Sequence, residues 1–379
     1  MNEHALPPEP LANTRKASNA SASPRPTLEF CPSAPDIMRR HEAWWARDAI
    51  DRPLLIISAD RNPARPLTRR LDLLDTPETW LREKTLDLKQ TYFTGDALPN
   101  IRVDFGPTAL SGMLGGRVEV TSDSVWTHPS IEGDWPDASY WALDEDSIWW
   151  KRLRQLTALA AECAAGKFLV MAPDLGGTAD TLAGLRDSQR MCFDIMEQPQ
   201  YIVEALETTF PLWQRVFETF YAITRRYQAG TMHWVQLWSD RPYVVPTCDF
   251  NTLIGPKTFR EIFVPDLVRL GRAAGRMVFH LDGPEATRHV EALLEIPELD
   301  AIQFTIGAAA PSALPWIPMF RRIQASDKSL LAVCPYDEVV KVCQSLDPRG
   351  LAIWTVAPTP AEADSLVVDF LRHFGEFQE

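Results

Sequence analysis

Residues 277–307 read MVFHLDGPEATRHVEALLEIPELDAIQFTIG and hold one complete strand–helix–strand unit. Two apolar runs, at 277–282 and 301–307, flank a segment whose apolar residues recur with helical spacing. Both runs are nearly continuous in apolar residues, which is typical of strands covered on both faces of a parallel sheet. This stretch therefore predicts parallel strands with a helix packed across them.

The same unit recurs along most of the chain. Further apolar runs lie at 53–58, 101–106, 168–173, 232–238, 330–335 and 351–358, and helical segments follow at 201–228, 256–275, 284–296 and 360–374. Eight strands with helices between them predict a (β/α)8 barrel, the TIM-barrel architecture, and not an open doubly wound sheet. Residues 107–167 break the alternation, and we expect this Trp-rich stretch to lie near the mouth of the barrel.

Composition separates a tail from the folded part. Residues 1–35 are rich in Pro, Ser and Ala and predict a disordered tail, so a single domain is expected over 36–379, opened by a helix with Asp36 as N-cap. The chain has 38 Lys and Arg against 51 Asp and Glu, a net charge of -13. That balance argues against nucleic acid as the main partner, because phosphate binding needs clustered cations.

Targeting features and cysteine spacing bear on the compartment. The N-terminus lacks the charged and apolar segments of a secretory signal, and no apolar stretch is long enough to span a membrane. The six cysteines contain no C-x-x-C pair and are spread along the chain, at Cys31, Cys163, Cys192, Cys248, Cys334 and Cys343. This usage is typical of reduced thiols and predicts a cytoplasmic protein, with a homodimer left open.

The barrel rule selects candidate site residues, because functional groups lie at the carboxyl ends of barrel strands. Polar or aromatic groups at predicted strand ends are Asp104, Asp174, Trp238 with Asp240, His280 with Asp282, Cys334, and Trp354 with Thr355. His280 and Asp282 are two residues apart on an extended segment, so their side chains leave the same face. His280 is the best candidate for a titrating group or a metal ligand; the alternative is a histidine that Asp282 holds for structural reasons.

Two loops add further candidates. The polar segment 238–256, WSDRPYVVPTCDFNTLIGP, supplies Tyr243 and Asp249, although Asp249 could equally order the loop by side-chain hydrogen bonds to the backbone. In PDLGGTADTLAGLRD, at 173–187, Asp174 ends a strand, and Gly176–Gly177 either let a ligand approach the backbone or form an ordinary turn.

Four stretches resemble the uroporphyrinogen decarboxylase superfamily and keep its order over roughly 95–375. They are PDLGGTADTLAGLRD at 173–187, CDFNTLIGPKTFREIFVPDLVRL at 248–270, FHLDGPEATRHVEALLEIPELDAIQF at 279–304 and LDPRGLAIWTVAPTPAEADSLV at 346–367. The resemblance implies a TIM-barrel-like fold and one of two chemistries. One is cofactor-free decarboxylation of uroporphyrinogen, and the other is methyl transfer between a corrinoid and a zinc-activated thiol.

One departure from the family pattern argues against the heme-pathway branch, and the match at His280 favours the methyltransferase-like branch. The Arg-rich FMRQAGR-like segment of the heme-pathway decarboxylase is replaced by DRPLLIISADRNP, which argues against heme synthesis. His280 matches the zinc-binding histidine of the methyltransferases. Asp282 stands where that family has a cysteine, the last strand has none, and Cys334 is the thiol that could complete a His280, Asp282 and Cys334 metal site.

The leading hypothesis is a methyltransferase-like enzyme that acts on a small methylated or methyl-accepting molecule. It would use zinc or another divalent metal and a corrinoid protein as partner, with Asp174, Tyr243, Asp249, His280 and Asp282 as catalytic candidates and Asp104, Trp238 and Trp354 as candidate cofactor contacts. The Trp-rich stretch 126–150 could form the rim that meets a corrinoid. The alternatives are a cofactor-free carboxy-lyase, with Arg52, Arg61 or Arg241 holding substrate carboxylates, and a non-catalytic binding barrel.

Overall fold

Strands from the N-terminal and C-terminal parts of the chain form one mostly parallel sheet. The computed structural model describes residues 26–48, 52–64, 76–103, 106, 109–120, 125–307 and 312–375. Its largest sheet has the strand order β2-β1-β12-β11-β10-β9, in which β2 is antiparallel to β1 and the other pairs are parallel. The bounds are β1 Leu54–Asp60, β2 Thr91–Gly95, β9 Val278–Asp282, β10 Ala301–Thr305, β11 Ser329–Val333 and β12 Leu351–Ala357.

The remaining strands form three two-stranded sheets. β3 (Asn100–Arg102) pairs in parallel with β6 (Leu169–Met171), while β4 (Arg117–Val120) and β5 (Val125–His128) form a hairpin, as do β7 (Thr231–Met232) and β8 (Trp238–Ser239). Backbone hydrogen bonds continue the wall, from Ala172 N to Met232 O and from His280 N to Pro246 O. The fold is α/β, with a mostly parallel central sheet, and is consistent with a TIM-barrel-like arrangement. Within the described residues the assigned ladders do not join into one closed ring.

The predicted strand at 232–238 is wrong. Its two ends pair with each other as β7 and β8, and Gln236 between them has a φ of 62°. The segment turns back because Val235 and Leu237 pack inside the sheet against Tyr243. Burial of these apolar side chains therefore outweighs the extended conformation that the run favours.

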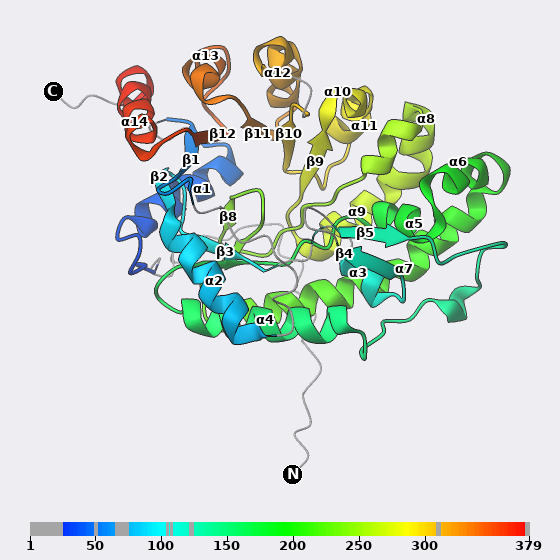
Figure 1. Cartoon of the computed structure of the whole chain (residues 1–379). Coiled ribbons are helices and arrows are strands. Elements are labelled where there is room, and N and C mark those ends of the chain that lie inside the picture. The colour runs from blue at the N-terminus through cyan, green and yellow to red at the C-terminus, as the bar shows by residue number, and fades with distance from the viewer. Residues whose placement is uncertain are drawn as a thin grey trace.

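Helices cover the outer face of the sheet. Figure 1 shows α14, α13, α12 and the pair α10 and α11 in a row outside β1, β12, β11, β10 and β9. The helices are α1 Ala34–Ala46, α2 Pro77–Gln90, α3 Ala109–Met113, α4 Ile148–Ala164, α5 Thr178–Arg186, α6 Ser188–Glu197, α7 Pro199–Thr224, α8 Pro256–Thr258, α9 Val264–Ala274, α10 Gly283–Ala286, α11 Val290–Leu294, α12 Ile317–Ala325, α13 Val339–Gln344 and α14 Pro360–Phe374.

Alternation along each strand separates an inner from an outer apolar cluster. Val278, Leu331 and Ala352 belong to the inner cluster, whereas their neighbours Phe279 and Leu330 belong to the outer one, under the helices. Because successive side chains point to opposite faces, the parity of a residue number within a strand decides whether its side chain can reach the interior.

The folded part begins earlier than the sequence predicts. Leu28 is buried, and the backbone NH groups of Glu29 and Phe30 donate to the carbonyl oxygens of Gly166 and Lys167. Helix α1 starts at Ala34 after Ser33, so Asp36 lies in its first turn and is not the N-cap. Residues 26–35 therefore belong to the fold, and residues 1–25 of the predicted tail lie outside the described residues.

The Trp-rich segment 126–150 has both buried and exposed tryptophans, and most of its other residues are exposed or half-buried. It contains β5, a short 3-10 helix at Ala138–Tyr140 and the start of α4. Trp141, Trp149 and Trp150 are buried in the outer cluster, while Trp126 on β5 has 61% of its surface exposed. In the part of the chain that the structure describes, no helix combines the length and apolar character needed to cross a membrane.

Candidate functional site

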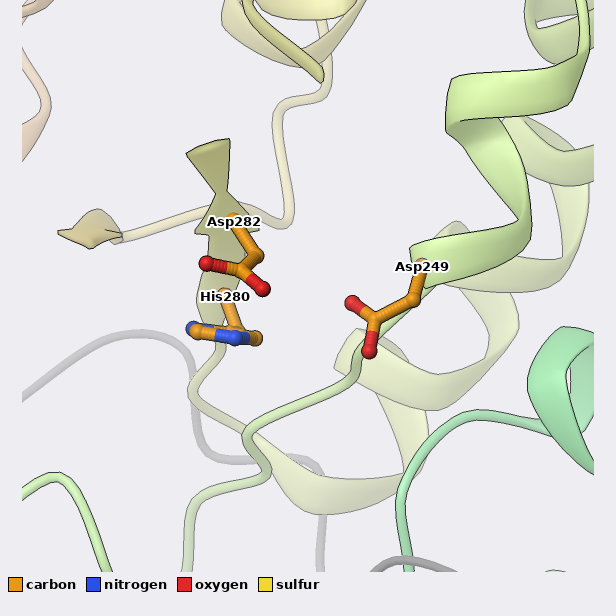
Figure 2. Close-up of side chains that lie close together, drawn as sticks. All are labelled: Asp249, His280 and Asp282. Carbon is orange, nitrogen blue, oxygen red and sulfur yellow. The ribbon is translucent and has the colours of Figure 1, made fainter. Parts of the chain in front are cut away.

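Three potential metal ligands meet at the carboxyl end of β9. His280 and Asp282 leave the inner face of β9, and Asp249 faces them from the start of the 3-10 helix Asp249–Leu253, as Figure 2 shows. One ligand atom from each of the three lies within 4.8 Å of the others. The alternation of side chains along β9 explains why His280 and Asp282 face the interior. Val278, on the same face of the strand, belongs to the inner cluster.

The His280 ring is held by contacts on two sides. Its Nδ1 is hydrogen-bonded to Oε1 of Gln303, the residue opposite His280 on β10, and Gln303 Nε2 donates to Thr305 Oγ1 at 2.8 Å. Since the amide nitrogen of Gln303 points at Thr305, its oxygen accepts a hydrogen bond from the Nδ1–H of His280, and the lone pair of the ring is then on Nε2. The Trp234 ring stands edge-on to the imidazole, with centroids 4.9 Å apart.

Asp249 is positioned by Asp180, which sequence reasoning did not select. Asp180 Oδ2 accepts from Asp249 N at 3.0 Å and from Thr247 Oγ1 at 2.6 Å, and its Oδ1 accepts from Phe250 N at 3.0 Å. The pKa of Asp249 is raised to about 6. The main cause is partial loss of hydration, and the second is repulsion by the nearby Asp180 carboxylate. The carboxylates crowd this site, and a bound cation would relieve their repulsion.

Asp174 lies beside this group and interacts electrostatically with His280 and Asp249. Its Oδ1 accepts from Gly176 N at 2.9 Å, and its Oδ2 lies 3.5 Å from a guanidinium nitrogen of Arg102. Burial raises the pKa of Asp174, while Arg102 opposes that shift. Arg102 was not among the arginines proposed from the sequence.

The two glycines after Asp174 are required by the conformation and close packing of the backbone. Gly176 has a φ of 58°, and a Cβ on Gly177 would overlap the carbonyl oxygen of Thr247. Gly177 is therefore required where the start of α5 meets the segment that carries Asp249. This close approach of two backbone segments explains the glycine without a ligand.

Two of the predicted residues lie in the core, away from this group. Tyr243 is fully buried, and its hydroxyl donates to Leu237 O at 2.6 Å and accepts from His233 N at 3.0 Å. Trp238 is buried, and its indole NH donates to Ala229 O at 2.9 Å. Both positions follow from the 233–237 turn, which directs this segment into the interior. The Tyr243 hydroxyl joins the two ends of the turn, and the Trp238 indole binds the segment before β7.

Cys334 is placed on the wrong face for the predicted metal site. It has the parity of Leu330 and Ala332, which belong with it to the outer cluster, and burial raises the pKa of its thiol well above the ordinary value. Its backbone NH donates to Trp354 O at 3.2 Å. The helix-facing side chain therefore points away from His280, and the predicted His280, Asp282 and Cys334 set is corrected to His280, Asp282 and Asp249.

The predicted cofactor contacts have different positions. Trp354 lies on the inner face of β12 and lines a cavity of about 400 Å³. Asp104 lies outside the described residues. Asp240, which follows Trp238, pairs with Arg276 at 2.6 Å, just before the amino end of β9 and thus away from the mouth.

Signals for the missed residues exist in the sequence but are weak. Gln303 is one of two polar residues inside the apolar run AIQFTIG, and Asp180 lies within the stretch 173–187, which was selected for Asp174. Their roles depend on register and on contacts between segments, which a single sequence does not give.

The donor set bears on which metal the site fits. One imidazole nitrogen and two carboxylates suit a divalent cation of intermediate to hard character, while a thiolate-rich zinc site needs cysteine ligands. In the described residues the metal-compatible group contains no thiol. His280 also has the outer contact that metal-binding histidines require, because Gln303 accepts from the opposite ring nitrogen.

Comparisons with known proteins support the fold. Neither a scan against protein-family models nor a search of curated proteins gives a match. Among solved structures, a methyltransferase from Methanosarcina mazei is similar, with a TM-score of 0.61 and 10% sequence identity over 89% of this chain and 98% of that chain. At this identity the similarity shows the overall architecture and leaves the reaction open.

Proposed function

We propose that this chain is a methyltransferase-like enzyme whose site at the carboxyl end of β9 binds a divalent metal through His280, Asp282 and Asp249. The observation that carries the proposal is the convergence of three ligand atoms within 4.8 Å, from two separate elements. Similarity in fold to a methyltransferase makes the transfer of a methyl group the reaction class of choice. The substrate is a small methylated or methyl-accepting molecule.

The residues have distinct roles in this proposal. His280, oriented by Gln303, offers its Nε2, and Asp282 and Asp249 offer carboxylate oxygens. Asp174 stays outside the ligand set and pairs with Arg102 at 3.5 Å. A bound metal would act as a Lewis acid and would favour the ionised form of a substrate group such as a thiol. Zinc fits this set, and so do other divalent ions.

A corrinoid protein as methyl-group partner belongs to the same proposal. The cavity that Trp354 lines, between β1, β2, β12 and α2, holds about 400 Å³, which suits a small molecule and not an entire corrinoid macrocycle. A corrinoid would therefore have to be presented at the mouth by its own protein. We also propose that the strands form a closed eight-stranded barrel and that the protein is a homodimer.

The carboxy-lyase alternative receives little support from its three arginines. Arg52 binds the buried Asp96 at 2.5 Å and precedes β1, at the end of the strand opposite the site. Arg241 lies 3.5 Å from Asp240, also away from the mouth, and Arg61 lies over the Tyr92 ring. None of these three arginines belongs to the group that Asp249, His280 and Asp282 form. The observations therefore favour the metal-dependent reading.

Elemental analysis of the purified protein tests the proposed metal site. We expect a divalent metal at about one per chain in the wild type and in Cys334→Ala, and less than about a tenth of that in His280→Ala, because loss of one of three ligands abolishes tight binding. Cys334→Ala is the matched control, since it removes the thiol that the outer cluster holds. Metal that survives His280→Ala, or that is lost in Cys334→Ala, would contradict the assignment.

A further inference from the structure

A cavity of about 400 Å³ lies between β1, β2, β12, α2 and the start of β3, apart from the proposed metal site. Among the described residues, its lining contains none of Asp249, His280 and Asp282. The volume is in the range of small-molecule sites. The chemistry of the lining therefore decides which class of ligand this second site takes.

The walls of the cavity are mostly apolar. Ile56 of β1 and Trp354 of β12 are opposite each other in the sheet register and lie on its inner face. Phe93 of β2, Leu88 of α2 and Ile101 of β3 complete the apolar surface. A flat apolar body placed against an indole and a phenyl ring gains from the loss of hydration and from contact between the rings. The walls therefore favour an aromatic ligand.

The charged groups of the described lining are already compensated. Lys84 pairs with Asp87 at 3.7 Å, and both residues line the cavity. Arg102, also in the lining, lies 3.5 Å from Asp174, and its guanidinium carbon is 5.9 Å from the centre of the Trp234 ring. An ion that entered the cavity would lose hydration and would find no unpaired opposite charge. This balance therefore selects an uncharged ligand.

Two neutral polar groups of the lining have hydrogen-bonding capacity that the protein does not use. Asn100 Nδ2 donates to Leu98 O at 2.8 Å and to Gln236 Oε1 at 2.9 Å, so the Gln236 amide presents its NH2 group elsewhere. Within the described residues that NH2 group has no acceptor, and the hydroxyl of Ser58 on β1 has no partner. Both residues are half-buried and line the cavity. A ligand with its own polar group is therefore favoured over a pure hydrocarbon.

We infer that this cavity binds an uncharged aromatic molecule that carries an amide-like polar group. The ring lies against Trp354 and Phe93, the oxygen of the ligand accepts from Gln236 Nε2, and an NH or OH of the ligand donates to Ser58 Oγ. The site goes beyond the proposed function, because its described lining shares no residue with the metal site.

Three probes of one shape test the charge preference, namely benzamide, which is uncharged, benzoate, which is an anion, and benzamidinium, which is a cation at neutral pH. Each is titrated into the full-length protein and followed by calorimetry. We expect benzamide to bind at least about tenfold more tightly than either ion, because each ion loses hydration without a partner. Equal or tighter binding of an ion, or no binding of benzamide at concentrations up to about 10 mM, would overturn the inference.

Gln236→Glu tests the amide donor. The change keeps the side-chain length and the acceptor for Asn100, but it replaces the NH2 group by a carboxylate oxygen. We expect benzamide binding to weaken about tenfold and benzamidinium binding to strengthen, because a negative charge without a cation partner enters the cavity. Gln189→Glu, the same change on the exposed surface of α6, should leave both affinities within about twofold of the wild type. Equal effects of the two substitutions would contradict the assignment.

Ser58→Ala is a smaller change that keeps the test open if Gln236→Glu does not fold. It removes a hydroxyl that the described protein does not use, so the thermal midpoint should be unchanged while benzamide binding weakens about fivefold. Ser365→Ala, on the exposed surface of α14, should leave binding within about twofold. Removal of divalent cations by a chelator should also leave it unchanged, since the proposed metal ligands lie outside the described lining. Unaltered binding in Ser58→Ala, or loss of binding with the chelator, would refute this site.

Discussion

Gln303 is the residue whose contact decides how His280 can act. It is fully buried, lies opposite His280 in the sheet, and accepts from Nδ1 while its own nitrogen donates to Thr305. We expect Gln303→Leu, which keeps the volume but removes the acceptor, to lower divalent-metal affinity about 10- to 100-fold. Thr305→Val should have a smaller effect, since it acts one hydrogen bond further away. Titration with Zn²⁺ followed by calorimetry measures both, and an unchanged affinity in Gln303→Leu would refute the role.

His233 gives the molecule a pH-dependent stability. It is buried, its Nε2 donates to Tyr243 O at 2.8 Å, and burial lowers its pKa from 6.5 to about 4. The folded state therefore binds fewer protons than the unfolded state between these values. The stability from neutral His233 is complete above about pH 6.5 and is lost as pH falls through about 4.

We expect this histidine to account for about 2 kcal/mol of the fall in unfolding free energy between about pH 8 and pH 5. Urea unfolding of the wild type and of His233→Asn at both pH values measures the contribution as a difference. The variant should be less stable at high pH, because it loses packing and a hydrogen bond, but its decline toward pH 5 should be smaller by that amount. Parallel declines in the two proteins would count against the prediction.

At the scale of elements, the start of α5 holds the segment that carries Asp249. Asp180 accepts hydrogen bonds from Thr247, Asp249 and Phe250, and Gly177 permits the close approach of the two backbones. We expect Asp180→Ala to lower the free energy of unfolding by about 2–3 kcal/mol and to weaken metal binding, because the loop loses its acceptor. Denaturant unfolding and metal titration report the two effects.

Asp137 provides a matched comparison for Asp180. It caps the 3-10 helix Ala138–Tyr140 by accepting from Ser139 N at 2.8 Å, but it lies on the exposed surface. Asp137→Ala should cost about 1 kcal/mol or less and should leave metal binding unchanged. If Asp180→Ala had no larger effect than Asp137→Ala, the loop would be held by other contacts.

At the scale of the whole molecule, residues 26–33 join the N-terminal segment to the far side of the sheet. Leu28 is buried with Met171 and Met232, and the Phe30 ring lies 5.7 Å from Phe168. We expect removal of residues 1–25 to leave the thermal midpoint unchanged, and removal of residues 1–33 to lower it by several degrees, because apolar burial is lost. Equal midpoints for the two truncated proteins would show that the 26–33 contacts add no stability.

The sequence by itself determined the positions of the parallel strands and the face of β9. Continuous apolar runs predicted β1, β6, β9, β10, β11 and β12 close to where they lie, because a strand buried on both faces leaves no polar positions. A spacing of two residues on an extended segment was enough to put His280 and Asp282 on one face.

Only the tertiary structure decided which other residues join them. Asp249 and Gln303 reach His280 through a loop and a neighbouring strand, and Cys334 is excluded by its parity. The apolar run 232–238 fits a strand or a buried turn equally well, and the packing of Val235 and Leu237 inside the sheet selected the turn. Contacts between distant segments are set by register and by competition for interior volume, and neither quantity is local to the chain.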